Sequence, residues 1–393
     1  MKICILGAGV VGVSTAFALS RIGHEVEVID RGTDVANGAS HANGAQLSWS
    51  YTNPLASPTI LPKLPAYALG LDPAMRVRPS LNPSFIKWGL SFLRNCTSAR
   101  YEMGGQARHQ LAIESQDALA SIERDLIDGP IEKTGKGKIV LAQTRAQQRA
   151  MKGSPLYKTA EECLSIEPAL RSWSKTQLGG LYAPDDSAVN PILFCQRLKN
   201  TAESEFGTVF RMGERVLDIL TESNRAYGIR TEKAVRRYDK IIVCLGNQSN
   251  DLLRPLGITA PICSVRGYSV TLPANEKSPK ASLTDLSNKI VFANLGDQVR
   301  IAGFADINAS DRKSSRRVAK LIKIARQHWP DIADYDADPK AWSGQRPMTP
   351  SGIPVIGPTK VEGLLLNVGH GSLGYTFSPG SAQRIADQIG SIQ

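Results

Sequence analysis

The feature that most constrains the fold of this 393-residue chain is a strand, turn, helix and strand pattern at its start. An apolar run over residues 3–6 predicts a strand, residues 10–21 have the pattern of a helix, and a second apolar run over 26–29 ends at Asp30. The turn between the first strand and the helix contains Gly7, Gly9 and Gly12. Such a turn, followed by an acid about 20 residues on, is typical of a dinucleotide-binding βαβ unit.

Each glycine of that turn has a physical role in binding a pyrophosphate. Gly7 permits the tight turn, Gly9 lets the backbone approach the phosphates, and Gly12 lets the helix pack close to the strand. The helix N-terminus presents free N–H groups and the positive end of its dipole. Asp30 can accept hydrogen bonds from both ribose hydroxyls, where a 2′-phosphate would be repelled. The nucleotide contacts expected here are Gly7, Gly9, Val10, Val11, Gly12, Asp30 and Arg31.

Composition narrows the class of protein. The 47 Lys and Arg against 36 Asp and Glu give a net charge of +11, which favours a phosphate-bearing cofactor, a carboxylate substrate or anionic lipid. No nucleic-acid-binding motif accompanies the charge, so we expect no nucleic-acid partner. Six scattered cysteines without CxxC spacing predict reduced thiols and a cytoplasmic protein, and the few unclustered histidines predict no metal site. We expect neither a signal peptide nor a membrane-spanning helix.

Changes of pattern along the chain predict two domains that are interleaved in the sequence. Asn190 and Pro191 have the residue types of an N-cap and a first helical position, so a helix is predicted there. Short strands alternate after it and end in a glycine turn at Gly246, a further expected cofactor contact. We expect a nucleotide-binding domain built from 1–48, 185–258 and 343–393, and a second domain built from 49–184 and 259–342.

Three further segments carry chemistry that points to a flavin. The first, residues 38–46, is rich in small residues whose backbone amides can line a pyrophosphate or a flavin ring. Its expected contacts are Ser40, Asn43, Gly44 and Gln46. The second, residues 344–357, holds Arg346 between turn residues, where a guanidinium can clamp a carboxylate. The third is an apolar strand over 364–368 that passes through a glycine turn at 369–374 into a helix, whose N-terminus would stabilise a reduced, anionic flavin.

With these segments the sequence resembles the flavin-dependent D-amino acid oxidase and glycine oxidase superfamily, and within it the bacterial D-amino acid dehydrogenase small-subunit type. The resemblance covers the full chain. Its most specific stretches are 7–30, 40–46, 93–96, 266–269, 346–357 and 369–374. It implies a two-domain α/β flavoprotein, with a Rossmann-like FAD domain of the glutathione-reductase type beside a substrate domain built on a mixed or antiparallel sheet. It also implies FAD bound non-covalently.

The resemblance assigns roles to single residues. The arginine of the Arg–Pro motif, here Arg346, pairs with the substrate carboxylate in that family. The aromatic residue after the mid-chain glycine, here Tyr268, often lines the substrate pocket, and the backbone at Val216 meets the adenine. The last glycine-rich turn binds the flavin ring through its backbone, here at Gly369, His370, Gly371, Ser372, Leu373 and Gly374. Asp30, Ser351 and His41 depart from residues common in relatives, where Glu, Asp and a small residue stand.

Ordinary structural roles compete with these assignments. Arg346 can hydrogen-bond turn carbonyls, Tyr268 can be a core aromatic, and His370 suits a turn residue that supplies its backbone better than a catalytic base. The stretch 311–329 predicts an amphipathic helix with basic residues over an apolar stripe. Its basic face is either solvated or docks on anionic lipid, where a reduced flavin meets a quinone.

The expected reaction is oxidative deamination of a D-amino acid to a 2-oxo acid and ammonia. Hydride passes from the α-carbon to flavin N5, and a quinone or similar acceptor takes the electrons. The alternatives are an oxidase or dehydrogenase of glycine, sarcosine or D-hydroxyproline, and a flavin-bearing subunit of a larger complex. The expected location is the cytoplasm, with a peripheral contact on the cytoplasmic face of the inner membrane.

Overall fold

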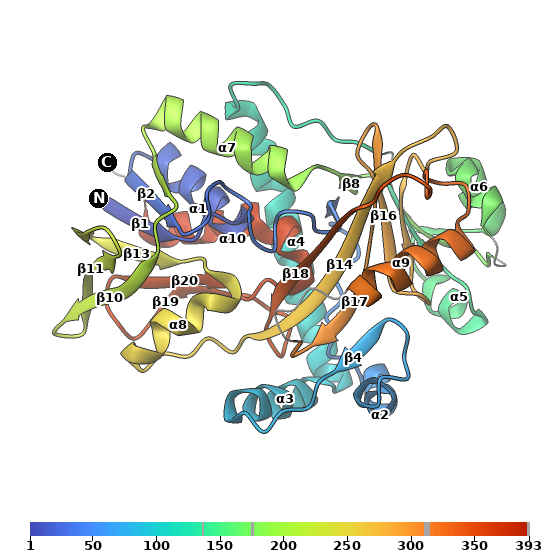
Figure 1. Ribbon diagram of the computed structural model, residues 1–393, viewed down its shortest axis with the longest axis horizontal. Coiled ribbons are helices and arrows are strands. Elements are labelled where there is room, and N and C mark those ends of the chain that lie inside the picture. The colour runs from blue at the N-terminus through green and yellow to red at the C-terminus, as the bar shows by residue number, and fades with distance from the viewer. Residues whose placement is uncertain (136, 174–176, 310–314, 391–393) are drawn as a thin grey trace.

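A mainly parallel sheet assembled from distant parts of the chain forms one half of the computed structural model, which describes residues 1–135, 137–173, 177–309 and 315–390 (Figure 1). Within those residues its strand order is β19–β20–β13–β1–β2–β9. The strands are β1 (Lys2–Leu6), β2 (Glu25–Asp30), β9 (Val209–Met212), β13 (Lys240–Val243), β19 (Val355–Pro358) and β20 (Leu364–Val368). All neighbours run parallel except β19, which is antiparallel to β20. The βαβ unit predicted at the start of the chain is confirmed.

Helices from four parts of the chain share one core beside this sheet. They are α1 (Val10–Arg21), α4 (Ser98–Asp125), α7 (Pro191–Phe206) and α10 (Gly374–Ile389). Helix α10 packs against both α1 and α4, and α7 packs against α1. The predicted start of α7 is confirmed, because the Asn190 side chain accepts a hydrogen bond from the Ile192 N–H at 3.1 Å.

A larger mixed sheet forms the other half of the molecule (Figure 1). In the described ranges its order is β18–β14–β17–β16–β15–β5–β7–β6, with β4 paired to β17. The strands are β4 (Met75–Val77), β5 (Lys138–Leu141), β6 (Tyr157–Lys158), β7 (Gly180–Ala183), β14 (Cys263–Pro273), β15 (Ser282–Asp285), β16 (Ile290–Asn294), β17 (Gln298–Ile307) and β18 (Lys340–Met348). Helix α9 (Ser315–His328) covers one face, packing Leu321 and Ala325 into the apolar core of the sheet.

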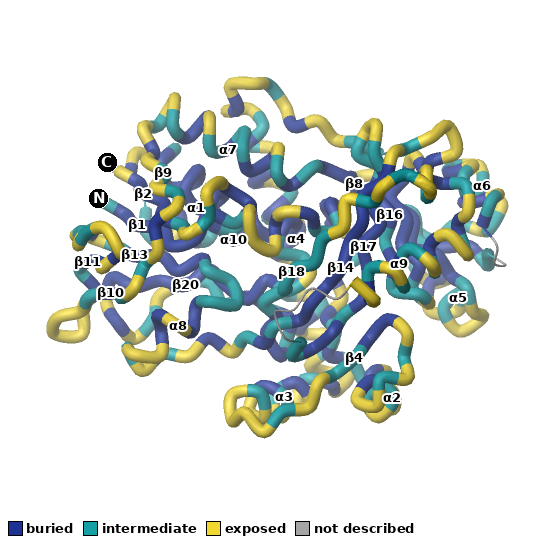
Figure 2. Tube along the Cα trace, in the orientation of Figure 1, coloured by how far each residue is buried: buried dark blue, intermediate teal, exposed yellow. Residues whose placement is uncertain are grey.

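Smaller elements surround the two sheets. A three-stranded sheet is formed by β10 (Val216–Glu222), β11 (Arg225–Thr231) and β12 (Val235–Arg237), and β3 (Gln46–Leu47) pairs with β8 (Ser187–Ala188). The remaining α-helices with described bounds are α2 (Leu64–Ala68), α3 (Pro83–Asn95), α5 (Arg145–Met151), α6 (Ala160–Ile166) and α8 (Ser249–Leu253). Figure 2 shows that the dark blue, buried trace runs through both sheets, whereas α2 and α3 project from the body and carry exposed stretches.

The expected domain boundaries differ from the observed sheets at two places. The boundary at residue 343 falls inside β18, which pairs with β14 along its whole length and so belongs to the mixed sheet. Helix α4 was expected in the second domain, yet Leu111, Leu119 and Ile122 lie in the core shared with α1 and α10. The two domains therefore exchange chain segments at more places than changes in sequence composition indicate.

No helix in the described ranges is both long and apolar enough to cross a bilayer. Among the same residues, His, Cys, Asp and Glu side chains form no group of three that could hold a metal ion. The six cysteines are all free and buried.

Candidate functional site

The turn between β1 and α1 has room for glycine alone at two positions. Gly7 has φ +107°, and a Cβ added there would lie 2.8 Å from the Cys244 carbonyl oxygen. A Cβ at Gly12 would lie 1.8 Å from the Gly7 carbonyl oxygen, so the predicted close packing of helix on strand is confirmed. Helix α1 begins after Gly9, which supplies no capping side chain. The turn therefore presents backbone at the carboxyl end of the parallel strands.

The Asp30 carboxylate closes this turn from the end of β2. It accepts the Ala8 N–H at 2.7 Å and the Gly32 N–H at 2.6 Å. Each carboxylate oxygen keeps acceptor capacity for a further donor. The Glu214 N–H donates to the Asp30 carbonyl oxygen at 2.9 Å, which brings the start of β10, and with it Val216, beside Asp30. Arg31 is exposed next to them.

The 38–46 loop joins the start of α1 to the mixed sheet. Ser40 Oγ accepts the Val10 N–H at 3.0 Å, so its side chain caps α1 from a distance. Asn43 Oδ1 accepts the Ala45 N–H at 2.8 Å. A Cβ at Gly44 would lie 3.3 Å from the Val291 side chain, and Gln46 Nε2 donates to the Phe292 carbonyl oxygen at 3.3 Å. The loop is thus held between the two halves of the molecule.

Strand β18 is where the remaining predicted segments meet. Met348 pairs with His370 in an isolated antiparallel bridge, which attaches the 369–374 turn to the end of the strand. Asn247 Nδ2 donates to the Gln345 carbonyl oxygen at 3.0 Å. A Cβ at Gly246 would lie 3.6 Å from the Pro347 side chain. The structure therefore brings Gly246, the Arg346 segment and the last glycine turn together.

The Arg346 guanidinium lies flat across β14. A Cβ at Gly267 would be 2.3 Å from Arg346 Nη2, and Nη1 donates to the Phe304 carbonyl oxygen at 2.8 Å. Burial lowers the pKa of Arg346, but a guanidinium stays charged at neutral pH. Arg346 therefore does hydrogen-bond a backbone carbonyl, as the competing structural role predicts, and this bond uses only Nη1 of its guanidinium. Its other guanidinium nitrogens make no hydrogen bond to the described residues, so they remain for an anion.

The face of the sheet that carries Arg346 is turned toward the 38–46 loop. Residues paired directly across antiparallel strands point to the same face. The pairs Val265–Arg346 and Ser269–Trp342 therefore share a face, and Ser269 Oγ donates to the Ala42 carbonyl oxygen at 2.6 Å. On this face the Trp342 ring lies over Gly344, where a Cβ would be 2.1 Å from the indole. Trp342 is a candidate pocket residue that the sequence reasoning missed.

Tyr268 points to the opposite face, and here the expectation needs correction. It pairs with Ser343, one step out of phase with Arg346, and only 3% of it is exposed. Its hydroxyl donates to Asp306 Oδ2 at 2.8 Å, and Arg317 Nη2 donates to Asp306 Oδ1 at 2.6 Å. Burial and the Asp306 carboxylate raise the pKa of Tyr268 to about 12. The structure places Tyr268 in the core under α9, as the competing structural role requires.

The same network corrects the expected basic face of 311–329. Arg317 is buried, and its guanidinium lies 4.3 Å from the centre of the Phe304 ring. It belongs to the core rather than to a lipid-facing surface. Residues 311–314, which include Arg312 and Lys313, lie outside the described residues.

His370 is a buried histidine within the 369–374 turn. Its Nε2 has no hydrogen-bond partner among the described residues, and burial lowers its pKa to about 3. Gly369 and Gly371 on either side have φ of +85° and +62°. A buried, unpartnered ring nitrogen is costly unless a polar group meets it. It fits a heteroaromatic ring with polar edges bound against this turn.

Three buried charged residues that the sequence did not predict as a group are Arg108, Lys138 and Asp186. Arg108 of α4 donates to the carbonyl oxygens of Thr52 and Gly352, so it ties the loop at Thr52 to the segment that contains Arg346. Lys138 Nζ donates to Ser48 Oγ at 2.9 Å, and that hydroxyl donates to Asp186 Oδ2 at 3.2 Å. Burial lowers the pKa of Lys138 and raises that of Asp186. A lysine opening the apolar run at 138–142 was the one available signal.

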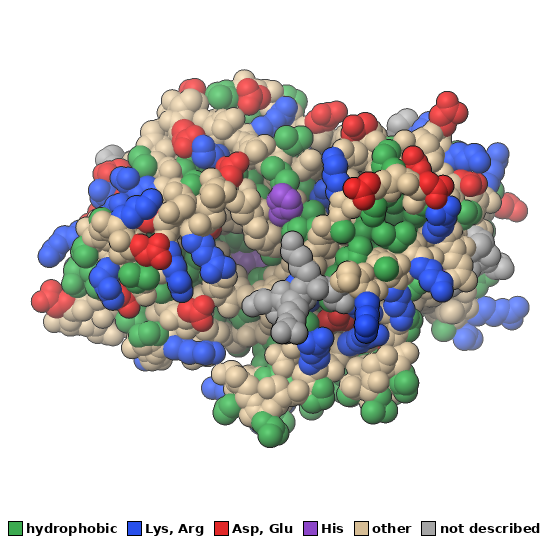
Figure 3. Space-filling model, viewed as in Figure 1, with side chains coloured by type: hydrophobic (Ala, Val, Ile, Leu, Met, Phe, Trp, Pro, Cys, Tyr) green, Lys and Arg blue, Asp and Glu red, His purple; other side chains and the backbone are tan. Residues whose placement is uncertain are grey.

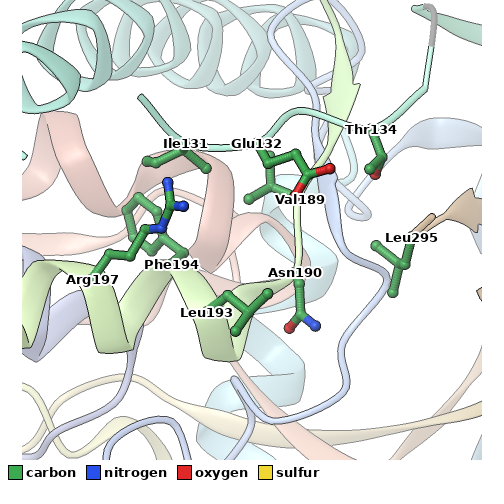
Figure 4. A pocket seen from close by; sticks show the side chains of 9 residues that line it. All are labelled: Ile131, Glu132, Thr134, Val189, Asn190, Leu193, Phe194, Arg197 and Leu295. Carbon is green, nitrogen blue, oxygen red and sulfur yellow. The ribbon is translucent and has the colours of Figure 1, made fainter. Parts of the chain in front are cut away.

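A small cavity lies at the start of α7, away from these residues (Figure 4). Its volume is about 90 Å³, below the roughly 300–1,000 Å³ typical of small-molecule sites. Its lining residues are Ile131, Glu132, Thr134, Val189, Asn190, Leu193, Phe194, Arg197 and Leu295. It contains none of the residues expected at the site, so the candidate site remains at β18 and the glycine turns.

The residues present fit FAD. The glycine turn after β1 and the Asp30 carboxylate suit the pyrophosphate and ribose, and the 369–374 turn with its unpartnered His370 nitrogen suits the flavin ring. The glycine turns follow β1, β13 and β20, which are successive parallel strands, so they lie at the carboxyl edge where parallel sheets bind ligands.

Comparison with known proteins agrees with this geometry. D-amino acid dehydrogenase 2 of Ralstonia nicotianae is 36% identical over 99% of this chain and 96% of its own length. D-amino acid dehydrogenase of Allorhizobium ampelinum is 36% identical over 100% of this chain and 96% of its own length. Among solved structures, glycine oxidase of Geobacillus kaustophilus covers 99% of this chain and 94% of its own, with a TM-score of 0.75 and 22% identity. That likeness establishes the fold. Residues 2–388 match the FAD dependent oxidoreductase family, and the chain belongs to this family.

Proposed function

We propose that this protein oxidises D-amino acids to 2-oxo acids and ammonia, with FAD as its cofactor and a quinone as the final electron acceptor. The observation that carries the proposal is the Arg346 guanidinium, which lies across Gly267 on the face that looks toward the flavin loop. A carboxylate-bearing substrate is the natural partner of such a fork. The D-amino acid dehydrogenases that are 36% identical to this chain support the choice of substrate.

The cofactor would be held at both ends by backbone. The 7–12 turn, Asp30 and the Val216 segment would take the adenosine and pyrophosphate, and the 40–46 loop with the 369–374 turn would take the flavin. When bound, FAD supplies the two-electron oxidant. The protein's own contribution is position and charge.

Arg346 would fix the substrate carboxylate and so set which bond of the α-carbon faces the cofactor. Its Nη1 is already held by the Phe304 carbonyl oxygen, so little side-chain freedom is lost on binding. His370 stays neutral over the working pH range because burial keeps its pKa near 3. An imidazole with so low a pKa is too weak a base to deprotonate an ammonium group, so in this proposal the substrate amine arrives unprotonated or loses its proton to solvent. Water then hydrolyses the imino acid to the 2-oxo acid and ammonia.

Trp342 would form a wall of the pocket beside Arg346, over Gly344. Tyr268 has no substrate contact in this proposal, because its hydroxyl is held by Asp306 on the other face. The buried Lys138–Ser48–Asp186 chain positions the segment that follows the flavin loop, since Asp186 Oδ1 also accepts the Trp49 N–H at 2.9 Å.

An anaerobic absorbance titration of the purified flavoprotein tests the proposal. D-amino acids should bleach the flavin band, matched L-isomers should not, and a soluble quinone should restore the band faster than air. Bleaching only by glycine, sarcosine or D-hydroxyproline would overturn the choice of substrate. Rapid reoxidation by air would overturn the choice of acceptor. A flavin band unchanged by every substrate would instead identify a subunit that turns over only with a partner.

A further inference from the structure

The projection formed by α2, β4 and α3 carries an unusual set of exposed apolar side chains. We name as the apolar tip six residues that are between 44% and 92% exposed: Leu69, Leu71, Leu81, Ile86, Leu90 and Leu93. Figure 3 shows hydrophobic side chains gathered along the lower edge of the molecule, where Figure 1 places α2 and α3. Scattered single leucines are ordinary on a surface, but six exposed apolar side chains on one projection indicate an interaction site.

Helix α3 has two apolar stripes where a core-packed helix needs one. Trp88 and Phe92 are buried, and their rings stack with centroids 5.2 Å apart. Ile86, Leu90 and Leu93 follow the spacing i, i+4, i+7, so they form a second stripe that faces solvent. Burial in the core does not explain this second stripe. It requires an external apolar phase or partner.

The charge around the tip favours an anionic partner. Lys87 and Arg94 are exposed and seven residues apart, so they form a basic row along α3 beside the second stripe, and Lys63 is exposed nearby in the sequence. Asp72 is the only acidic residue in the sequence between Asp34 and Glu102. Its carboxylate lies 3.3 Å from Lys289 Nζ. The tip therefore presents leucine and isoleucine flanked by cations, with its one acidic residue already paired.

We infer that the apolar tip docks this protein on an anionic lipid surface. Helices that bind at a membrane interface place apolar side chains at the boundary with the acyl chains and Lys or Arg beside the lipid headgroups. The described part of α9 is a weaker candidate for lipid binding. Arg317 is buried there, and the apolar residues of α9 face the core. The docking surface lies close to the redox site, because Trp88 Nε1 donates to the Met348 carbonyl oxygen at 2.9 Å, two residues from Arg346. Docking is independent of the reaction proposed above, since lipid binding needs no turnover.

Vesicle co-sedimentation of the flavin-loaded protein tests this inference. The wild type should pellet with phosphatidylcholine vesicles containing phosphatidylglycerol, and less so at high salt. Leu90→Glu should weaken binding about tenfold or more. Lys87→Ala with Arg94→Ala should weaken it roughly 25-fold, at about fivefold for each charge. Ile127→Glu, at a matched exposed position elsewhere, should bind like the wild type.

Three results would overturn the inference. The first is no binding of the wild type to anionic vesicles at low salt. The second is a loss of binding in Arg316→Ala with Lys323→Ala on α9 while Leu90→Glu still binds normally. The third is a dimer in sedimentation velocity that Leu90→Glu dissociates, since a second copy of the chain would then cover the tip. The flavin band and activity with a soluble acceptor should be unchanged in every variant, which confirms that each is folded.

Discussion

The guanidinium of Arg346 occupies the space that a side chain at Gly267 would fill, with Nη2 only 2.3 Å from the position of a Cβ. Two adjacent antiparallel strands thus cooperate to lay a long charged side chain flat on a sheet. Because Gly267 of β14 has no side chain, the guanidinium of Arg346 on β18 can lie in the space above it. The glycine is therefore part of the proposed carboxylate site, because it determines where the Arg346 guanidinium lies.

Gly267→Ala should displace Arg346 without unfolding the protein. The atom it meets is the far end of a flexible side chain, so the cost in stability should be within about 1 kcal/mol. KM for a D-amino acid should rise about tenfold or more, with the flavin band retained. Steady-state kinetics and thermal melts measure both effects. Gly153→Ala, where a Cβ meets nothing within 4 Å, is the matched control and should leave KM unchanged. An unaltered KM in Gly267→Ala would mean that the position of Arg346 does not govern binding.

Replacing Arg346 itself separates charge from geometry. Arg346→Ala should raise KM about 10- to 100-fold, the value of a charged, bidentate hydrogen bond, and should retain FAD. Arg346→Lys should recover only part of that loss, because an ammonium cannot form the two parallel bonds. Kinetics with a carboxylate substrate and flavin absorbance check both variants, and Arg316→Ala serves as an exposed control. Unchanged kinetics in Arg346→Ala would refute the assignment.

Tyr268→Phe tests the placement of Tyr268 in the core. Losing the bond to Asp306 should lower the free energy of unfolding by about 1–2 kcal/mol, while kcat and KM stay within about twofold. Tyr238→Phe is a matched control beside the parallel sheet, because the Tyr238 hydroxyl donates to the buried Glu27 carboxylate of β2 at 2.5 Å. The two variants should lose similar stability in chemical denaturation. A large fall in kcat for Tyr268→Phe alone, with its fold intact, would restore a catalytic role.

Local pattern was sufficient to predict the geometry of the glycine turn after β1, but not which residues line the proposed substrate pocket. Gly7, Gly12 and Asp30 lie within one βαβ unit, so their spacing alone predicts their geometry. Tyr268 and Gly267 are neighbours on one strand, and a single step in register exchanges the faces they occupy. That register depends on pairing with β17 and β18, which no local pattern reveals. The face assignment could therefore be made only from the assembled sheet.

Long-range polar contacts were equally out of reach. Arg108 and Gly352 are 244 residues apart, and their hydrogen bond depends on how α4 packs against the other helices. Lys138 and Asp186 have no shared motif, and they meet through Ser48 only after three segments are assembled. The boundary expected at residue 343 failed for the same reason, since β18 is assigned by its partner strand and not by its own composition.

His370 should make the protein less stable as the pH falls from neutrality. Burial holds its pKa near 3 in the folded protein, whereas an exposed histidine titrates near 6.5. The unfolded chain therefore binds the proton first, so stability is constant above about pH 6.5 and declines below it by about 1.4 kcal/mol per pH unit. Between pH 7 and pH 5 this one group should lower the free energy of unfolding by about 2 kcal/mol.

His370→Asn, which cannot titrate, should show a shallower decline over that range in chemical denaturation, whatever its stability at pH 7. His109→Asn, at an exposed position, should follow the wild type. Parallel curves for His370→Asn and the wild type would mean that the folded protein takes up a proton at His370 as readily as the unfolded chain does, and the lowered pKa of His370 would have to be abandoned.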